Sequence, residues 1–97
     1  MKRYTTPTVV IDVPDGAQAL AEAERVIVAA KGRQLIEKDA ASVDGTAVAV
    51  PYTQAETAAL GAGLVEFEVT LKMPDGSVVK TETAEAQLKE AVLRREV

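Results

Sequence analysis

The clearest pattern along the chain is a two-residue alternation of apolar and polar side chains from Leu64 to Met73. The apolar members are Val65, Phe67, Val69, Leu71 and Met73, and the polar members are Glu66, Glu68, Thr70 and Lys72. Successive side chains of a strand point to opposite faces, so this segment predicts a strand with one buried and one wet face. Pro74-Asp75-Gly76 then predicts a hairpin turn, with a partner strand from Ser77 onward.

Shorter segments with the same rhythm predict further strands. They cover Thr8–Val13, Arg25–Ala30, Arg33–Lys38 and Thr46–Tyr52, with expected inward positions Val9, Ile11, Val13, Val26, Val28, Val48, Val50 and Tyr52. Asp15-Gly16, Lys31-Gly32 and Asp44-Gly45 are the turn signals between them. In the third segment Leu35 and Ile36 point to opposite faces, so one of them must be less buried.

Prolines indicate where the strands end or lie at an edge. Pro7 and Pro14 bracket the first strand, and Pro51 falls within the fourth. Proline cannot donate to a hydrogen-bond ladder, so each of the three marks a sheet edge or a strand end.

One short helix is predicted between two strands. Thr53 and Glu56 have the spacing of a capping box, in which each side chain satisfies a backbone N–H at the start of the helix. We expect a helix over Gln54–Leu60 that crosses between two sheets and ends at Gly61. Ala17–Glu24 is rich in helix-forming residues but short, so it is expected to be a loop with at most one helical turn.

The C-terminal stretch carries two conflicting signals. Thr83–Arg95 has the strongest helix propensity in the chain, which favours a terminal helix. Ala84, Ala86 and Leu88 stand at alternate positions and would lie on one face of a strand, which favours a strand in the first half of the stretch. From these residues alone, residues 83–96 are either a strand followed by a turn or a terminal helix.

Taken together, six or seven short strands with turns every 8–12 residues predict an all-β fold, a small antiparallel β-sandwich. The 97 residues correspond to a single domain, 1–97. Alanine (17) and valine (14) dominate the apolar residues, so we expect a thin core.

The composition excludes much chemistry. The chain has no histidine, cysteine or tryptophan. Without histidine or cysteine, the usual Ser-His-Asp and Cys-His devices, disulfides and Cys-type zinc sites cannot form within one chain. We therefore expect no enzyme, and no catalytic, cofactor-binding or metal-binding residues.

Charge and hydropathy argue against two classes of partner. The net charge is −4, only three residues are aromatic, and the cations do not form a stripe, so no nucleic-acid partner is expected. Apolar runs of four or five residues fall far short of the roughly 20 that a membrane span needs. The charged N-terminus is followed by no apolar segment, so no signal peptide and a cytosolic location are expected.

Several residues invite a functional interpretation and have a simpler structural one. The aspartates at 12, 15, 39, 44 and 75 lack calcium-loop spacing, and those at 44 and 75 precede glycine in turns. Glu66 and Glu68 are expected on a solvated outer face, where Glu37, Glu82, Lys72 or Lys80 could pair with them. Gly61-Ala-Gly63 lacks the lysine of a phosphate loop and leads into a strand.

The remaining candidates are serines, tyrosines and charged strand residues. Ser42 and Ser77 have no base near them in the sequence and are expected in turns or strands. Tyr4 and Tyr52 are expected as core or sheet-edge aromatics. Lys80, Glu82 and Pro51 have the character of residues that protect sheet edges.

A set of short motifs resembles small proteins of phages and prophages of Gram-positive bacteria. The motifs are Thr6-Pro7-Thr8-Val9, the Ala23–Val28 element, Thr53-Gln54-Ala55-Glu56-Thr57, Gly61-Ala62-Gly63 and Asp75-Gly76. Those proteins resemble the N-terminal immunoglobulin-like domain of phage baseplate upper proteins. This chain departs from the pattern at Ala55, where the family has a glutamate-type residue, at Glu68, often glutamine, and in its Ala- and Glu-rich tail.

The resemblance implies a fold and a role. The fold is an immunoglobulin-like sandwich in which Ser77 to about Leu88 forms one long strand beside Leu64–Met73, followed by a turn or extension over Lys89–Val97. The role is a non-enzymatic structural or adaptor module of a tail or baseplate, in the bacterial host cytoplasm or the assembled virion. Its partners would be phage tail proteins or a second copy of itself; the alternative is a cytosolic prophage accessory protein that binds a host factor.

Overall fold

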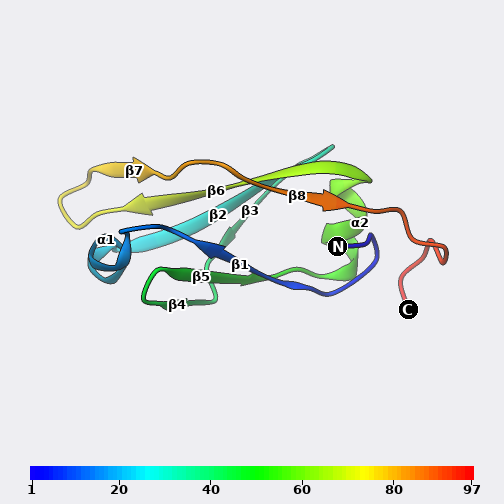
Figure 1. Ribbon diagram of the computed structural model, residues 1–97, viewed down its shortest axis with the longest axis horizontal. Coiled ribbons are helices and arrows are strands. Elements are labelled where there is room, and N and C mark those ends of the chain that lie inside the picture. Colours follow the sequence, from blue (N-terminus) through cyan, green and yellow to red (C-terminus); the bar gives the residue numbers. More distant parts are fainter.

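Two antiparallel β-sheets face each other in the computed structural model, which describes residues 1–97 (Figure 1). The strands are β1 (Thr8–Asp12), β2 (Arg25–Lys31), β3 (Leu35–Asp39), β4 (Ser42–Asp44), β5 (Ala47–Pro51), β6 (Gly63–Lys72), β7 (Val78–Lys80) and β8 (Ala84–Leu88). Two short helices, α1 (Ala17–Glu22) and α2 (Gln54–Leu60), complete the chain. The expected all-β, sandwich-like architecture is confirmed, with eight strands in place of six or seven.

The core lies between the two sheets and follows the predicted alternation. The first sheet has the order β1-β5-β4, and the second contains β3-β2-β6 with β7 and β8 beyond β6. The buried apolar residues are Ile11, Val13, Leu20, Val28, Ala30, Val48, Val50, Tyr52, Leu60, Val65, Phe67, Val69, Leu71 and Leu88. Of the predicted inward residues, Val9, Val26 and Met73 are only partly buried and pack against this cluster.

The expected long strand after the hairpin is interrupted. β7 and β8 pair with the same edge of β6, in registers that differ by one residue: Lys80 lies opposite Thr70, and Ala84 lies opposite Phe67. Three residues, 81–83, therefore span two residues of β6, which is the geometry of a β-bulge. The extra residue changes which positions face the core. In β7 the odd-numbered Val79 faces inward, whereas in β8 the even-numbered Ala84, Ala86 and Leu88 face inward.

The C-terminal stretch is a strand followed by irregular chain, and the terminal helix does not form. Leu88 is fully buried and pairs with Gly63, which fixes the stretch as part of the sheet. Burial of an apolar side chain outweighs the few tenths of a kcal/mol per residue that helix propensity supplies. Residues 89–97 have no regular structure, and Val92 is 98% exposed.

Both helices are fixed by particular residues. The capping box is present as predicted: the Glu56 N–H donates to Thr53 Oγ1 (3.2 Å) and the Thr53 N–H donates to Glu56 Oε1 (2.9 Å). α2 joins β5 to β6 and so crosses between the sheets. The expected loop at 17–24 is instead the six-residue helix α1, because Leu20 reaches the core and adds packing to a favourable local propensity.

Two further differences from expectation are the later start of β3 and the additional strand β4. β3 begins at Leu35 rather than Arg33, because the Gly32 N–H donates to the Gln34 carbonyl and extends the turn. Leu35 is 59% exposed and Ile36 is partly buried, as their opposite parity requires. β4 was not predicted: its three residues are too short for a recognisable alternation, and they form a strand only through pairing with β5.

Candidate functional site

Two of the aspartates considered as calcium ligands, Asp75 and Asp12, accept hydrogen bonds from nearby groups. Asp75 accepts hydrogen bonds from the Ser77 backbone N–H (2.8 Å) and hydroxyl (2.6 Å), which hold the pKa of this carboxyl below its usual value. Asp12 accepts from the Thr46 hydroxyl at 2.6 Å. No group of three or more His, Cys, Asp or Glu side chains comes together in a way that could hold a metal ion.

Glu66 and Glu68 lie on the outer face of the second sheet, as predicted. Lys80 Nζ lies 3.5 Å from a Glu68 carboxylate oxygen, which confirms one of the expected cross-strand pairs. Glu66 lies opposite Lys31 on one side and opposite Glu85 on the other. The two carboxylates therefore form a row along a solvated face and do not face each other across a pocket.

Tyr52 is a core residue at the end of β5. It is only 3% exposed, its ring centroid lies 6.2 Å from that of Phe67, and its hydroxyl has no hydrogen-bond partner. Burial, with a smaller contribution from the charge of Glu56, raises the pKa of Tyr52 to about 12. Tyr4, by contrast, is partly exposed, with a positive φ of 60° and the Arg3 guanidinium 5.2 Å from its ring centroid.

A lysine ties the start of α2 to β3. Lys38 Nζ donates to Glu56 Oε1 at 2.9 Å and to the Pro51 carbonyl, and it lies 5.2 Å from the Tyr52 ring centroid. Partial burial acts to raise the pKa of Glu56, but the hydrogen bonds from Lys38 and Thr53 outweigh it and leave the pKa below its usual value. The two charges of this cluster, Lys38 and Glu56, are paired with each other, and they connect β3 to the start of α2.

A second connection joins the two ends of the chain. The Arg3 guanidinium donates to both oxygens of Glu90 (2.8 and 3.1 Å) and to the Ala58 carbonyl in α2 (2.8 and 3.1 Å). The hydrogen bond from Arg3 holds the pKa of Glu90 below its usual value. Sequence analysis missed this contact because its partners are 87 positions apart and no local pattern links them.

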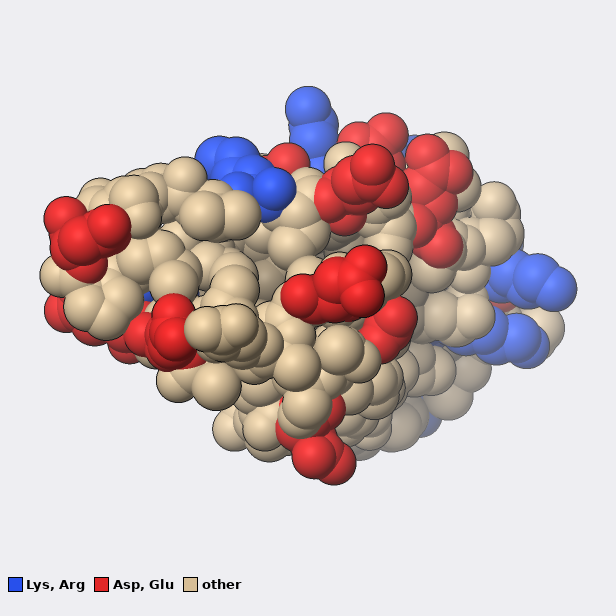
Figure 2. Space-filling model, turned by 60° about the vertical axis from the view of Figure 1, so that its left-hand side comes forward, with Lys and Arg blue, Asp and Glu red and all other residues tan.

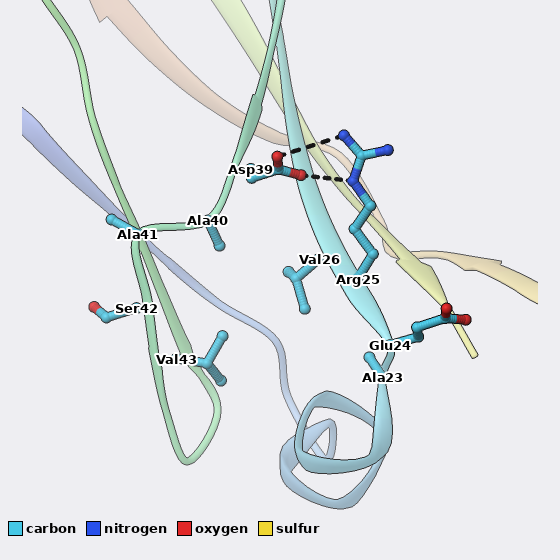
Figure 3. A pocket seen from close by; sticks show the side chains of 9 residues that line it. All are labelled: Ala23, Glu24, Arg25, Val26, Asp39, Ala40, Ala41, Ser42 and Val43. Carbon is cyan, nitrogen blue, oxygen red and sulfur yellow. Dashed lines mark hydrogen bonds and ion pairs between the residues drawn. The ribbon is translucent and has the colours of Figure 1, made fainter. Parts of the chain in front are cut away.

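One open hollow lies between the start of β2 and the connection from β3 to β4 (Figure 3). It has a volume of about 390 Å³, and its lining includes Val26 and Val43 together with three alanines. At its rim Arg25 and Asp39 point toward each other and are joined at 2.7 and 3.4 Å, which lowers the pKa of Asp39 and raises that of Arg25. Arg25 and Asp39 are paired with each other, which leaves Glu24 as the one charged side chain of the lining without an ion pair. Ser42, at its edge, points away from Val43.

A larger hollow lies between the edges of the two sheets. It has a volume of about 540 Å³ and is lined by Asp12–Pro14, at the end of β1, and by Val79–Ala84, which includes the bulge. Lys80 and Glu82 therefore lie at a sheet edge, as predicted. Pro51 ends β5, a central strand, so its prediction as a strand end is confirmed and its prediction as an edge residue is wrong.

On the face drawn in Figure 2 acidic side chains are widely spread, and the basic ones stand in separate groups. Neither helix is long and apolar enough to cross a membrane. No protein-family model, curated protein or solved structure matches the chain.

Proposed function

We propose that this chain is a non-enzymatic structural or adaptor module of a phage or prophage tail or baseplate, which acts through contact with other proteins. The observation that carries the proposal is the order of the strands in the two sheets. This order supports an immunoglobulin-like fold, which is the fold implied by the motif resemblance.

The strand order supports an immunoglobulin-like arrangement when it is read along the chain. In those domains strands B, E and D belong to one sheet, and strands C, F and G, with C′ in the variable type, belong to the other. Assigning β1 to β6 to B, C, C′, D, E and F in turn gives the sheets B-E-D and C′-C-F, and leaves strand A, which flanks B in those domains, without a counterpart. β7 and β8, on the far edge of β6, then take the place of strand G as two halves separated by the bulge.

The surface favours binding of proteins over chemistry. The hollows are open, and Arg25 and Asp39 at the rim of the hollow beside β2 are paired with each other, while apolar side chains lie exposed on or beside strand edges. Val10 is 62% exposed, and Val78 and Val79 are also exposed on β7. Open strand edges offer backbone groups to a neighbouring protein, which is a common mode of recognition between β-proteins.

The experiment is to follow the tagged chain in the bacterium that carries its gene. After prophage induction, particles are purified and their tail fractions are analysed by mass spectrometry. We expect the chain in the tail fraction or bound to a tail protein. A parallel culture carrying Phe67→Ala, which removes a core side chain, controls for adhesion of unfolded protein. A chain absent from particles and bound to no tail protein contradicts the proposal, and capture of a host protein instead favours the accessory role.

A further inference from the structure

The edge strand β1 leaves one complete row of backbone groups without a partner. The Tyr52 N–H donates to the Pro7 carbonyl, and the Val13 N–H donates to the Thr46 carbonyl, so odd-numbered positions of β1 bond to β5. The alternation of an antiparallel ladder therefore turns the N–H and C=O groups of Thr8, Val10 and Asp12 to the open side. No other strand pairs with β1.

The other edges are better protected. β4 has only three residues, and a self-paired β3 would place Glu37 opposite its own copy. The β7–β8 edge carries the bulge, Lys80 and Glu82, and its far end is covered where Lys2 pairs in parallel with Lys89. Short strands, charges and bulges are the devices by which proteins prevent unwanted strand pairing, and β1 has the fewest of them.

β1 is also complementary to itself. When two copies are placed antiparallel about Val10, Thr8 of each copy faces Asp12 of the other, and the two Val10 side chains meet. All three outward-facing residues then form reciprocal backbone pairs, the Thr8 hydroxyl can donate to the Asp12 carboxylate, and the exposed Val10 is covered. A register shifted by two residues forms fewer backbone pairs between the two β1 strands. A register centred on Asp12 places the two Asp12 carboxylates opposite each other.

We infer that a second copy of this chain binds at the open edge of β1 and forms a twofold dimer with the six-stranded sheet β4-β5-β1-β1-β5-β4. Such an interface is self-complementary, as a twofold contact requires. The partly exposed Val9 then lies opposite Ile11 of the second copy, which extends the core across the contact. The dimer goes beyond the proposed function and stands or falls independently of it.

The test is the concentration dependence of mass, measured by sedimentation from about 1 μM to about 1 mM. The wild-type chain should move from 10.2 kDa toward twice that mass. Val10→Lys, which places two lysines opposite each other, should weaken dimerisation at least about tenfold. Leu35→Lys is the matched control, because Leu35 has nearly the same exposure (59% against 62%) on a different edge strand, and it should dimerise like wild type.

Two substitutions at position 8 test the register without touching Val10. Thr8→Lys places a cation opposite Asp12 of the second copy and should strengthen the dimer, whereas Thr8→Asp should weaken it. Circular dichroism confirms that each variant is folded. A wild-type chain that is monomeric throughout overturns the inference and leaves the edge to a strand of another protein. Equal effects of Val10→Lys and Leu35→Lys, or shifts of the same sign in both position-8 variants, also overturn it.

Discussion

At the scale of single residues, the core depends on a few large side chains set among many small ones. Phe67 is the only phenylalanine, and it is buried in the middle of β6 beside Tyr52. Most of the other residues of the buried cluster are valines and leucines. Such a core offers few large side chains that can move into an empty space, so single truncations should be costly.

Phe67→Ala should therefore lower the free energy of unfolding by about 3–5 kcal/mol, because it removes a buried aromatic side chain and leaves a cavity. Urea unfolding followed by circular dichroism measures the change. Leu64→Ala, at an exposed position of the same strand, is the control and should change stability by less than about 0.5 kcal/mol. Similar losses in the two variants would show that Phe67 is not central to the core.

Tyr52→Phe should leave the chain equally stable or stabilise it by up to about 1 kcal/mol. The Tyr52 hydroxyl is buried without a hydrogen-bond partner, so its removal relieves a desolvation cost while the ring and its packing remain. The same urea experiment decides the sign. A loss of more than about 1 kcal/mol would mean that the hydroxyl has a partner in solution.

At the scale of elements, tertiary pairing decides wherever local propensity is weak or conflicting. The β6 alternation and the α2 capping box could be predicted from the sequence because each is a complete local signal. The bulge at 81–83 could not, because no residue in that segment reveals which register each half of the edge adopts. The Arg25–Asp39 pair and the open edge of β1 depend on strand neighbours, which the alternation alone does not specify.

Cross-strand pairing also places two like charges together. Glu66 and Glu85 lie directly opposite each other on the outer face of the sheet, an arrangement that costs stability. Glu85→Lys should therefore raise the free energy of unfolding by about 0.2–1 kcal/mol. Glu96→Lys makes the same change of charge in the irregular tail, and a matching gain there would assign the effect to net charge instead of to the pair.

At the scale of the whole molecule, stability between acid and neutral pH should depend on pH only in the acid part of that range. The pKa values of Asp39, Glu56, Asp75 and Glu90 are all lowered by hydrogen bonds in the folded chain. The unfolded chain therefore binds more protons in acid than the folded chain. The stability that these four carboxylates contribute is fully present above their ordinary pKa values of 3.8 and 4.5, and it is lost as the pH falls through their lower pKa values in the folded chain.

The urea midpoint should consequently be the same at about pH 6 and pH 7.5, since the chain has no histidine, and lower at about pH 3. Glu56→Gln, which removes one of the lowered carboxyls, should show a smaller drop between pH 6 and pH 3 than wild type. A midpoint that rises on acidification would contradict the assigned hydrogen bonds.

The central claim is that this molecule is a two-sheet scaffold whose strand edges are what it offers to other proteins. Residue-resolved amide hydrogen exchange of the isolated chain in dilute solution tests it most directly. Along the edge beside β6, the structure predicts slow exchange of the amides at odd positions 79 and 81 before the bulge and at even positions 84, 86 and 88 after it. In β1 it predicts fast exchange of the amides of Thr8, Val10 and Asp12. Consecutive slow amides from 83 to 95, as in a helix, together with protection all along β1, would contradict it.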